Sequence, residues 1–194
     1  MPQGIRLPKE QRNDGDFYPT PYWVLQSLLD QWSPPLGPVL EPAAGSGNLL
    51  RVLRRQYPDV ELHAVELMSE HADILKLSSD HLWIHDFLTW APPENVEYGA
   101  IITNPPFSLA QYFVEKALTV PHRAVAMLLP LNFLASRKRY AFWQTHPCTT
   151  IAVLSERPSF NGAGTAAQDY AWFIWDDSTD SLAQHIIHLR RRSN

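Results

Sequence analysis

The 194-residue sequence has one cysteine, Cys148, which excludes an internal disulfide framework and a metal site built from several cysteines. It has no run of about 18 or more apolar residues and no apolar N-terminal stretch, so it predicts neither a membrane span nor a signal peptide. A reducing, cytoplasmic setting is the expectation that follows. The net charge is −4, whereas nucleic-acid-binding proteins usually carry an excess of basic residues.

Two common nucleotide-binding patterns are absent as well. The sequence contains no Gly-Lys-Ser or Gly-Lys-Thr, so a phosphate-cradling Walker loop is excluded. A dinucleotide fingerprint begins at Gly45-Ser46-Gly47, but Leu50 stands where its third glycine would be, which argues against NAD. The ligand expected at this turn is therefore an adenosine derivative without phosphates.

What the sequence does contain is an alternation of short apolar runs with amphipathic segments, the pattern of an α/β domain. The expected strands are residues 38–40, 61–66, 82–84, 98–103, 124–129, 149–154 and 169–176. Helices are expected over 21–31, directly after Gly47, and over 69–77, 109–117 and 131–143, the first with Thr20 as its N-cap and Pro21 at its first position.

The last two strands are separated by a loop rather than by a helix, which predicts a mostly parallel seven-stranded sheet with one antiparallel strand and helices on both faces. Residues 184–189 are a candidate for an additional edge strand. Residues 1–16 are polar and aperiodic, so we expect a loosely held arm followed by a single domain over 17–194.

The strand at 98–103 ends in the most informative motif of the chain, Asn104-Pro105-Pro106-Phe107. Each proline disfavours the helical region for the residue before it, so Asn104 and Pro105 must both be extended. A carboxamide, a backbone carbonyl and an aromatic ring at a strand end suit the binding of a planar group that carries an NH2. The ordinary alternative is a proline-rich turn without a ligand.

Other candidate residues also follow strand ends, where open α/β sheets bind their ligands. Gly45 and Gly47 allow a ligand to approach the backbone after the first strand. Glu66 ends the second strand, 19 residues after Gly47, where an acid binds ribose hydroxyls in nucleotide sites. Asp86 and Phe87 follow the third strand, where they can hydrogen-bond to a purine and stack on it.

Taken together, Glu41-Pro42-Ala43-Ala44-Gly45-Ser46-Gly47 and Asn104-Pro105-Pro106-Phe107 resemble the motifs of the S-adenosylmethionine-dependent amino-methyltransferases, most of all the small DNA adenine-N6 methyltransferases of bacteria and phages. The resemblance implies a Rossmann-like class I methyltransferase fold with S-adenosylmethionine as cofactor and no separate target-recognition domain. It also implies that the aromatic and Thr-Pro segment at 17–21 covers the methionine end of the cofactor. The cofactor-binding residues that it implies are Tyr18, Thr20, Pro21, Glu41, Pro42, Ala43, Gly45, Gly47, Glu66, Leu67, Asp86, Phe87 and Asn104.

The same resemblance assigns catalysis to Asn104, Pro105, Pro106 and Phe107. The Asn104 side-chain oxygen and the Pro105 carbonyl would accept the two hydrogens of the adenine amine, while Phe107 stacks on the target base. DNA is the expected substrate. The alternatives are an RNA adenine, a protein glutamine amide, or a non-catalytic cofactor-binding subunit of the same fold.

The loop at 155–168 joins a parallel strand to an antiparallel one, so it must lie at the same sheet edge as Asn104. In it, Arg157 is a candidate for a phosphate or a base edge and Phe160 for a flipped base; the alternative is a plain connector. No metal site is expected, because the histidine pairs 81/85 and 185/188 have no third ligand motif.

Overall fold

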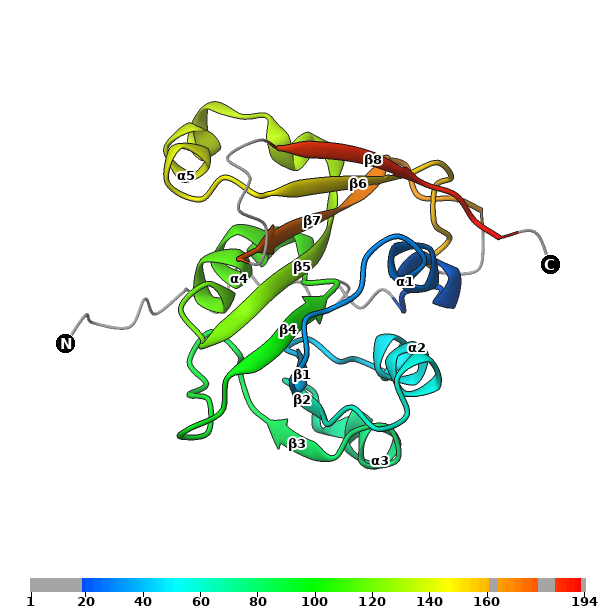
Figure 1. The fold of residues 1–194 in the computed structure, drawn as a ribbon, viewed down its shortest axis with the longest axis vertical. Coiled ribbons are helices and arrows are strands. Elements are labelled where there is room, and N and C mark those ends of the chain that lie inside the picture. The colour runs from blue at the N-terminus through cyan, green and yellow to red at the C-terminus, as the bar shows by residue number, and fades with distance from the viewer. Residues whose placement is uncertain (1–18, 161–163, 178–183, 193–194) are drawn as a thin grey trace.

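The computed structural model describes residues 19–160, 164–177 and 184–192, and these form one sheet with helices on both faces (Figure 1). The sheet has eight strands in the order β3-β2-β1-β4-β5-β7-β6-β8. The strands are β1 (Val39–Glu41), β2 (Leu62–Glu66), β3 (His81–Ile84), β4 (Tyr98–Thr103), β5 (His122–Pro130), β6 (Thr150–Leu154), β7 (Tyr170–Asp176) and β8 (His185–Leu189). The expected arm at 1–16 lies outside the described residues.

The predicted parallel sheet with one antiparallel strand is confirmed, because β7 runs antiparallel between β5 and β6 and all other pairs are parallel. The candidate edge strand at 184–189 is present as β8, so the sheet has eight strands rather than seven. β8 pairs in parallel with β6 over five residues, from Thr150 opposite His185 to Leu154 opposite Leu189. Its side chains are mostly exposed, as at the edge of a sheet.

The helices divide between the two faces of the sheet (Figure 1). One face is covered by α1 (Tyr22–Leu29), α2 (Asn48–Gln56) and α3 (Ala72–Lys76), and the other by α4 (Ala110–Ala117) and α5 (Tyr140–Thr145). Short 3-10 turns occur at Ser69–His71, Phe107–Leu109, Leu131–Leu134 and Arg137–Arg139. Among the described residues, no helix is both long and apolar enough to cross a membrane.

The single helix expected over 131–143 is wrong. Ala135 and Ser136 are extended, with ψ angles of 136° and 149°, and they separate the 3-10 turn Leu131–Leu134 from the turn Arg137–Arg139, which leads directly into the short helix α5. The Ser136 hydroxyl accepts from the Arg139 backbone N–H, and the Arg139 guanidinium lies 4.5 Å from the centre of the Phe133 ring. These local contacts compete with a continuous helix, as serine side chains commonly do.

The chain order places a crevice between β1 and β4. From β1 the chain moves outward to β2 and β3, then returns to form β4 on the other side of β1. At such a switch point the loops after the two central strands separate, which leaves room for a ligand. The loops concerned are the glycine turn after Glu41 and the segment that begins at Asn104.

Candidate functional site

A cavity of about 410 Å³ opens at this switch point, large enough for a nucleoside-sized ligand. Its described lining includes the carboxyl groups of Glu41, Glu66, Glu70 and Asp86 and contains neither lysine nor arginine. That composition does not suit phosphate groups. The residues predicted as site residues that line the cavity are Thr20, Glu41, Pro42, Ala43, Gly45, Glu66, Leu67, Asp86, Phe87, Asn104 and Pro106.

The Glu66 carboxylate fixes the glycine turn to the end of β2. One of its oxygens accepts from the Gly45 backbone N–H at 2.6 Å, and the other accepts from the Met68 N–H at 2.7 Å. Gly45 has a φ of 51°, a left-handed conformation that glycine adopts without strain. Because a carboxylate oxygen can accept two hydrogen bonds, this arrangement is compatible with ribose hydroxyls at Glu66.

Glu41 is a buried acid beneath the same turn, with 2% of its surface exposed. Burial raises the pKa of its carboxyl well above the usual value, and the charge of the neighbouring Glu66 raises it further. A hydrogen bond from the Leu50 N–H, in the first turn of α2, and the charge of Arg51 lower the pKa in part. Within the described structure, its Oε2 is buried without a hydrogen-bond partner. A buried carboxyl oxygen that lines a cavity without a partner is suited to bind a polar ligand atom.

Thr20 joins the loops that follow β1 and β4. Its hydroxyl oxygen accepts from the Asn104 side-chain nitrogen at 3.0 Å, and its backbone carbonyl accepts from the Asn48 side-chain nitrogen at 2.8 Å. The predicted N-cap role of Thr20 is therefore wrong. Pro21 occupies the N-cap position of α1, without a side-chain capping hydrogen bond.

Arg51 and Asn48 hold the glycine turn, and neither was predicted as a site residue. The Arg51 guanidinium donates to the Ser46 carbonyl at 2.7 Å, to the Asn48 side-chain oxygen and to the Tyr22 hydroxyl at 3.0 Å. The sequence places Arg51 on the polar side of an amphipathic helix, which is why periodicity treats it as a solvated charge. The sequence signal that could have identified Arg51 is its position one turn into a helix that follows a glycine turn.

Asp86, Phe87 and Leu67 line the cavity in different ways. The Asp86 side chain accepts from the Leu88 N–H at 3.1 Å. Phe87 is only 2% exposed and packs against Phe113 and Trp90, so much of the ring belongs to the core. Leu67 is 48% exposed, which is the expected state of an apolar side chain beside an open cavity.

The remaining predicted residues lie outside the cavity lining. They are Pro21, Gly47, Pro105, Phe107, Arg157 and Phe160, while Tyr18 lies outside the described residues. Gly47 is the N-cap of α2 with a φ of 76°. Arg157 is exposed and paired with Asp169 at 2.7 Å.

The loop after β6 does reach the Asn104 motif, as its topology predicts. The rings of Phe107, Phe160 and Tyr170 form a triangle with centroid separations of 5.2 to 6.2 Å. Phe160 is 7% exposed, so it is a packing partner of Phe107 rather than an open clamp. Residues 161–163 of this loop lie outside the described residues.

Comparison with known proteins adds relatives in sequence, although no family model matches the chain. The chain is 30% identical over 108 residues to the type II methyltransferase M.CvrRI of Paramecium bursaria Chlorella virus XZ-6E, covering 53% of this chain and 27% of that protein. It is 37% identical over 91 residues to a tRNA1(Val) (adenine(37)-N6)-methyltransferase of Klebsiella pneumoniae, covering 41% of this chain and 37% of that protein. The chain thus spans well under half the length of either relative.

A solved structure extends the likeness to nearly the whole chain. A proposed RNA methyltransferase from Pyrococcus horikoshii superposes with a TM-score of 0.60, covering 90% of this chain and 92% of that one at 18% identity, which shows the fold. The expected cofactor, S-adenosylmethionine, is the methyl donor that these relatives indicate. The expected resemblance is confirmed: in sequence and in fold, the chain is related to the S-adenosylmethionine-dependent methyltransferases.

Proposed function

We propose that the chain transfers a methyl group from S-adenosylmethionine to the exocyclic N6 amine of adenine in DNA. The observation that carries the proposal is the position of Asn104, whose side-chain nitrogen is held by Thr20 at the edge of the cavity. Because the nitrogen is directed at Thr20, the carbonyl oxygen is the amide atom that serves as acceptor for an amine hydrogen. The Pro105 carbonyl accepts the second hydrogen.

The cavity fits the cofactor on three counts. It is of nucleoside size, its described lining has carboxyl groups but neither lysine nor arginine, and it contains a buried carboxyl oxygen without a partner at Glu41. We assign the ribose hydroxyls to Glu66, the adenine to Asp86 and Phe87, and the methionine end to the segment at Thr20 and Pro21. The bound cofactor supplies an already activated methyl group, so no general base is required.

Catalysis by this chain is then a matter of positioning. An adenine amine is a poor nucleophile because its lone pair is delocalised into the ring. Two acceptors that hold its hydrogens orient the nitrogen and favour the tetrahedral character that develops in the transition state. Phe107, held against Phe160 and Tyr170, provides an aromatic face for the target base, worth about 1–3 kcal/mol.

We propose that residues 17–194 form a single methyltransferase domain. In support, the described residues from Val39 to Leu189 contribute their strands to one sheet. A duplex substrate must rotate its target base out of the helix to reach Asn104. RNA adenine is the second candidate, favoured by the 37% identity to a tRNA adenine-N6 methyltransferase.

The test is methyl transfer from tritiated S-adenosylmethionine to separate DNA, RNA and protein pools, followed by nucleoside analysis. We expect N6-methyladenosine in its deoxy form from DNA. Asn104→Ala should lower turnover by orders of magnitude while cofactor affinity stays close to wild type. The matched control is Gln144→Ala, which removes an exposed carboxamide on α5. Label only in RNA would replace DNA as the substrate, and label in no pool would contradict the proposal.

A further inference from the structure

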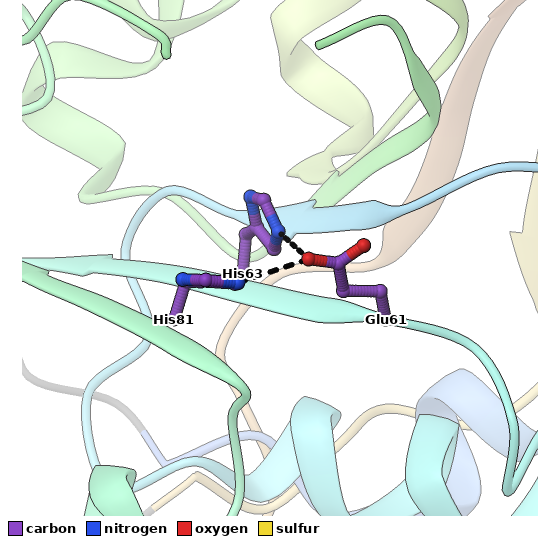
Figure 2. Close-up of side chains that lie close together, drawn as sticks. All are labelled: Glu61, His63 and His81. Atoms are coloured by element: carbon purple, nitrogen blue, oxygen red, sulfur yellow. Dashed lines mark hydrogen bonds and ion pairs between the residues drawn. The ribbon is translucent and has the colours of Figure 1, made fainter.

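At the opposite edge of the sheet from the cavity, two histidines and a glutamate converge. Figure 2 shows Glu61, His63 and His81 directed toward one another, with both imidazoles contacting the Glu61 carboxylate. The Glu61 Oε1 atom lies 3.0 Å from Nε2 of His63 and 3.0 Å from Nε2 of His81. Among the described residues, one group has three metal-binding side chains whose ligand atoms all lie within 4.8 Å, and it is this one.

Strand geometry explains why these three side chains share one face. Glu61 directly precedes β2 and His63 is its second residue, and side chains two residues apart in extended backbone point to the same side. His81 is the register partner of His63 in the parallel pair of β2 and β3. The cluster is therefore fixed by backbone pairing, and only the outer parts of Glu61 and His81 have rotational freedom.

We propose that Glu61, His63 and His81 form a binding site for a single Zn²⁺ ion, with water as the fourth ligand. Imidazole nitrogens and a carboxylate oxygen are zinc ligands, at about 2.0–2.2 Å from the ion. Tetrahedral coordination at those lengths separates the ligand atoms by roughly 3.4 Å. Small rotations of exposed side chains reach that separation from the 3.0 Å found here.

Burial and exposure are distributed as such a site requires. The His63 side chain is 4% exposed and anchors the ion, while those of Glu61 and His81 are 49% and 53% exposed and leave an entry path from solvent. Zn²⁺ binding replaces the two contacts to Glu61 by two nitrogen–metal bonds, and each neutral imidazole keeps its one proton, which moves from Nε2 to Nδ1.

Tyr98 contacts the ring nitrogen of His63 that does not face Glu61. Its hydroxyl lies 2.9 Å from Nδ1 of His63, and Tyr98 is fully buried at the start of β4. With Nε2 on the metal, the Nδ1–H group donates to the Tyr98 oxygen, the outer contact that metal-binding histidines almost always make. Tyr98 is a positioning residue in this scheme, because it touches His63 and not the ion.

The site is separate from the cavity, and we assign it to the stability of β3 and not to the reaction at the cavity. His63 and Glu66 are three residues apart on β2, which places them about 10 Å apart along the strand. β3 is an edge strand that pairs only with β2, and Asp86 and Phe87 follow it directly. The ion ties the first residue of β3 to β2 and thereby stabilises the strand that carries these two cavity residues.

The experiment is a calorimetric titration of the tag-free, full-length chain with ZnCl2 after treatment with a chelator. We expect one Zn²⁺ per chain and a melting temperature that rises with Zn²⁺ concentration by mass action. His81→Ala and Glu61→Gln change side chains that are about half exposed, and the melting temperature without Zn²⁺ checks that both variants fold. Each should weaken Zn²⁺ binding by more than the roughly 10- to 100-fold that loss of an outer contact costs, and Tyr98→Phe should fall within that range.

The matched control is His188→Ala, which removes an exposed histidine on β8 and should bind Zn²⁺ like wild type. Absence of a stoichiometric site in the wild-type chain would overturn the proposal. So would unchanged affinity in His81→Ala and Glu61→Gln, or an equal loss in His188→Ala. None of these readouts depends on methyl transfer, so the result is independent of the proposed function.

Discussion

The side-chain nitrogen of Asn104 donates to the hydroxyl of Thr20 at 3.0 Å, across 84 positions of sequence. Thr20 also accepts from Asn48 through its backbone carbonyl, so one residue sets the positions of two loops. The loop after β1 belongs to the cofactor side of the proposed site and the loop after β4 to the substrate side. A contact between them is a means of aligning the two reactants.

Thr20→Val tests this alignment, because valine keeps the shape of threonine and removes the acceptor. Loss of one hydrogen bond of about 0.5–1.5 kcal/mol should lower turnover by roughly 2- to 12-fold. Cofactor affinity by calorimetry should change less than turnover, since the contact orients Asn104. Thr20→Ser retains the hydroxyl and should recover most of the rate. A rate equal to wild type in Thr20→Val would show that Asn104 needs no such support.

Glu41 should make the stability of the cofactor-free protein depend on pH. The raised pKa means that the folded chain keeps a proton that the unfolded chain releases near its ordinary pKa of 4.5. Above that pH the unfolded state binds fewer protons than the folded state, so the free energy of unfolding falls as pH rises. The fall continues up to the folded pKa, at no more than about 1.4 kcal/mol per pH unit.

Glu41→Gln removes the ionisable group and keeps an oxygen for the Leu50 N–H. Denaturant unfolding between pH 5 and 8 should show the variant gaining stability relative to wild type as pH rises. A stability difference that is constant across this range would mean that Glu41 ionises in the folded chain as it does in the unfolded one. Asp30→Asn is a suitable control, because that carboxyl is paired with Arg192 at the surface.

Glu66→Ala should weaken cofactor binding by about 1–3 kcal/mol, the scale of a lost hydrogen bond to a charged group. The expected loss combines a direct contact to ribose with release of the Gly45 turn, which Glu66 holds at 2.6 Å. Titration with S-adenosylhomocysteine measures the affinity, and the melting temperature without ligand reports the release of the turn. Glu94→Ala, which removes an exposed acid, controls for net charge. Unchanged affinity in a folded Glu66→Ala protein would refute the assignment.

The parts of the site that could be predicted from sequence are those fixed by position along the chain. Glu41, Gly45, Glu66 and Asn104 directly end or follow short apolar strands, and parallel strands bring their carboxyl ends to one edge. Periodicity identifies the strands, and the fold then gathers these residues without further information. Seven of the eight strands were predicted in this way.

The parts that could not be predicted depend on contacts between distant segments. The meeting of His63 with His81 requires the register of β2 against β3, which local pattern does not specify. Arg51 reads as a solvated helix charge, although it holds Ser46 and Tyr22. The expected helix at 131–143 failed because Ser136 forms a local turn that side-chain periodicity does not register.

Phe160, the candidate for contacting a flipped base, packs in the structure against two other aromatic rings. Its ring packs edge-on against Phe107 at 6.2 Å and against Tyr170 at 5.2 Å, and the pair of Phe107 with Tyr170 closes the triangle at 5.3 Å. Phe160→Ala should destabilise the chain by about 3–5 kcal/mol through loss of packing, measured by denaturant unfolding. It also removes one of the two rings that position Phe107, so the KM for the nucleic acid should rise while cofactor affinity stays constant. Phe160→Leu restores most of the volume without an aromatic edge, and should recover stability more fully than KM. If KM follows stability in both variants, Phe160 acts through packing alone and the target base is held by other residues.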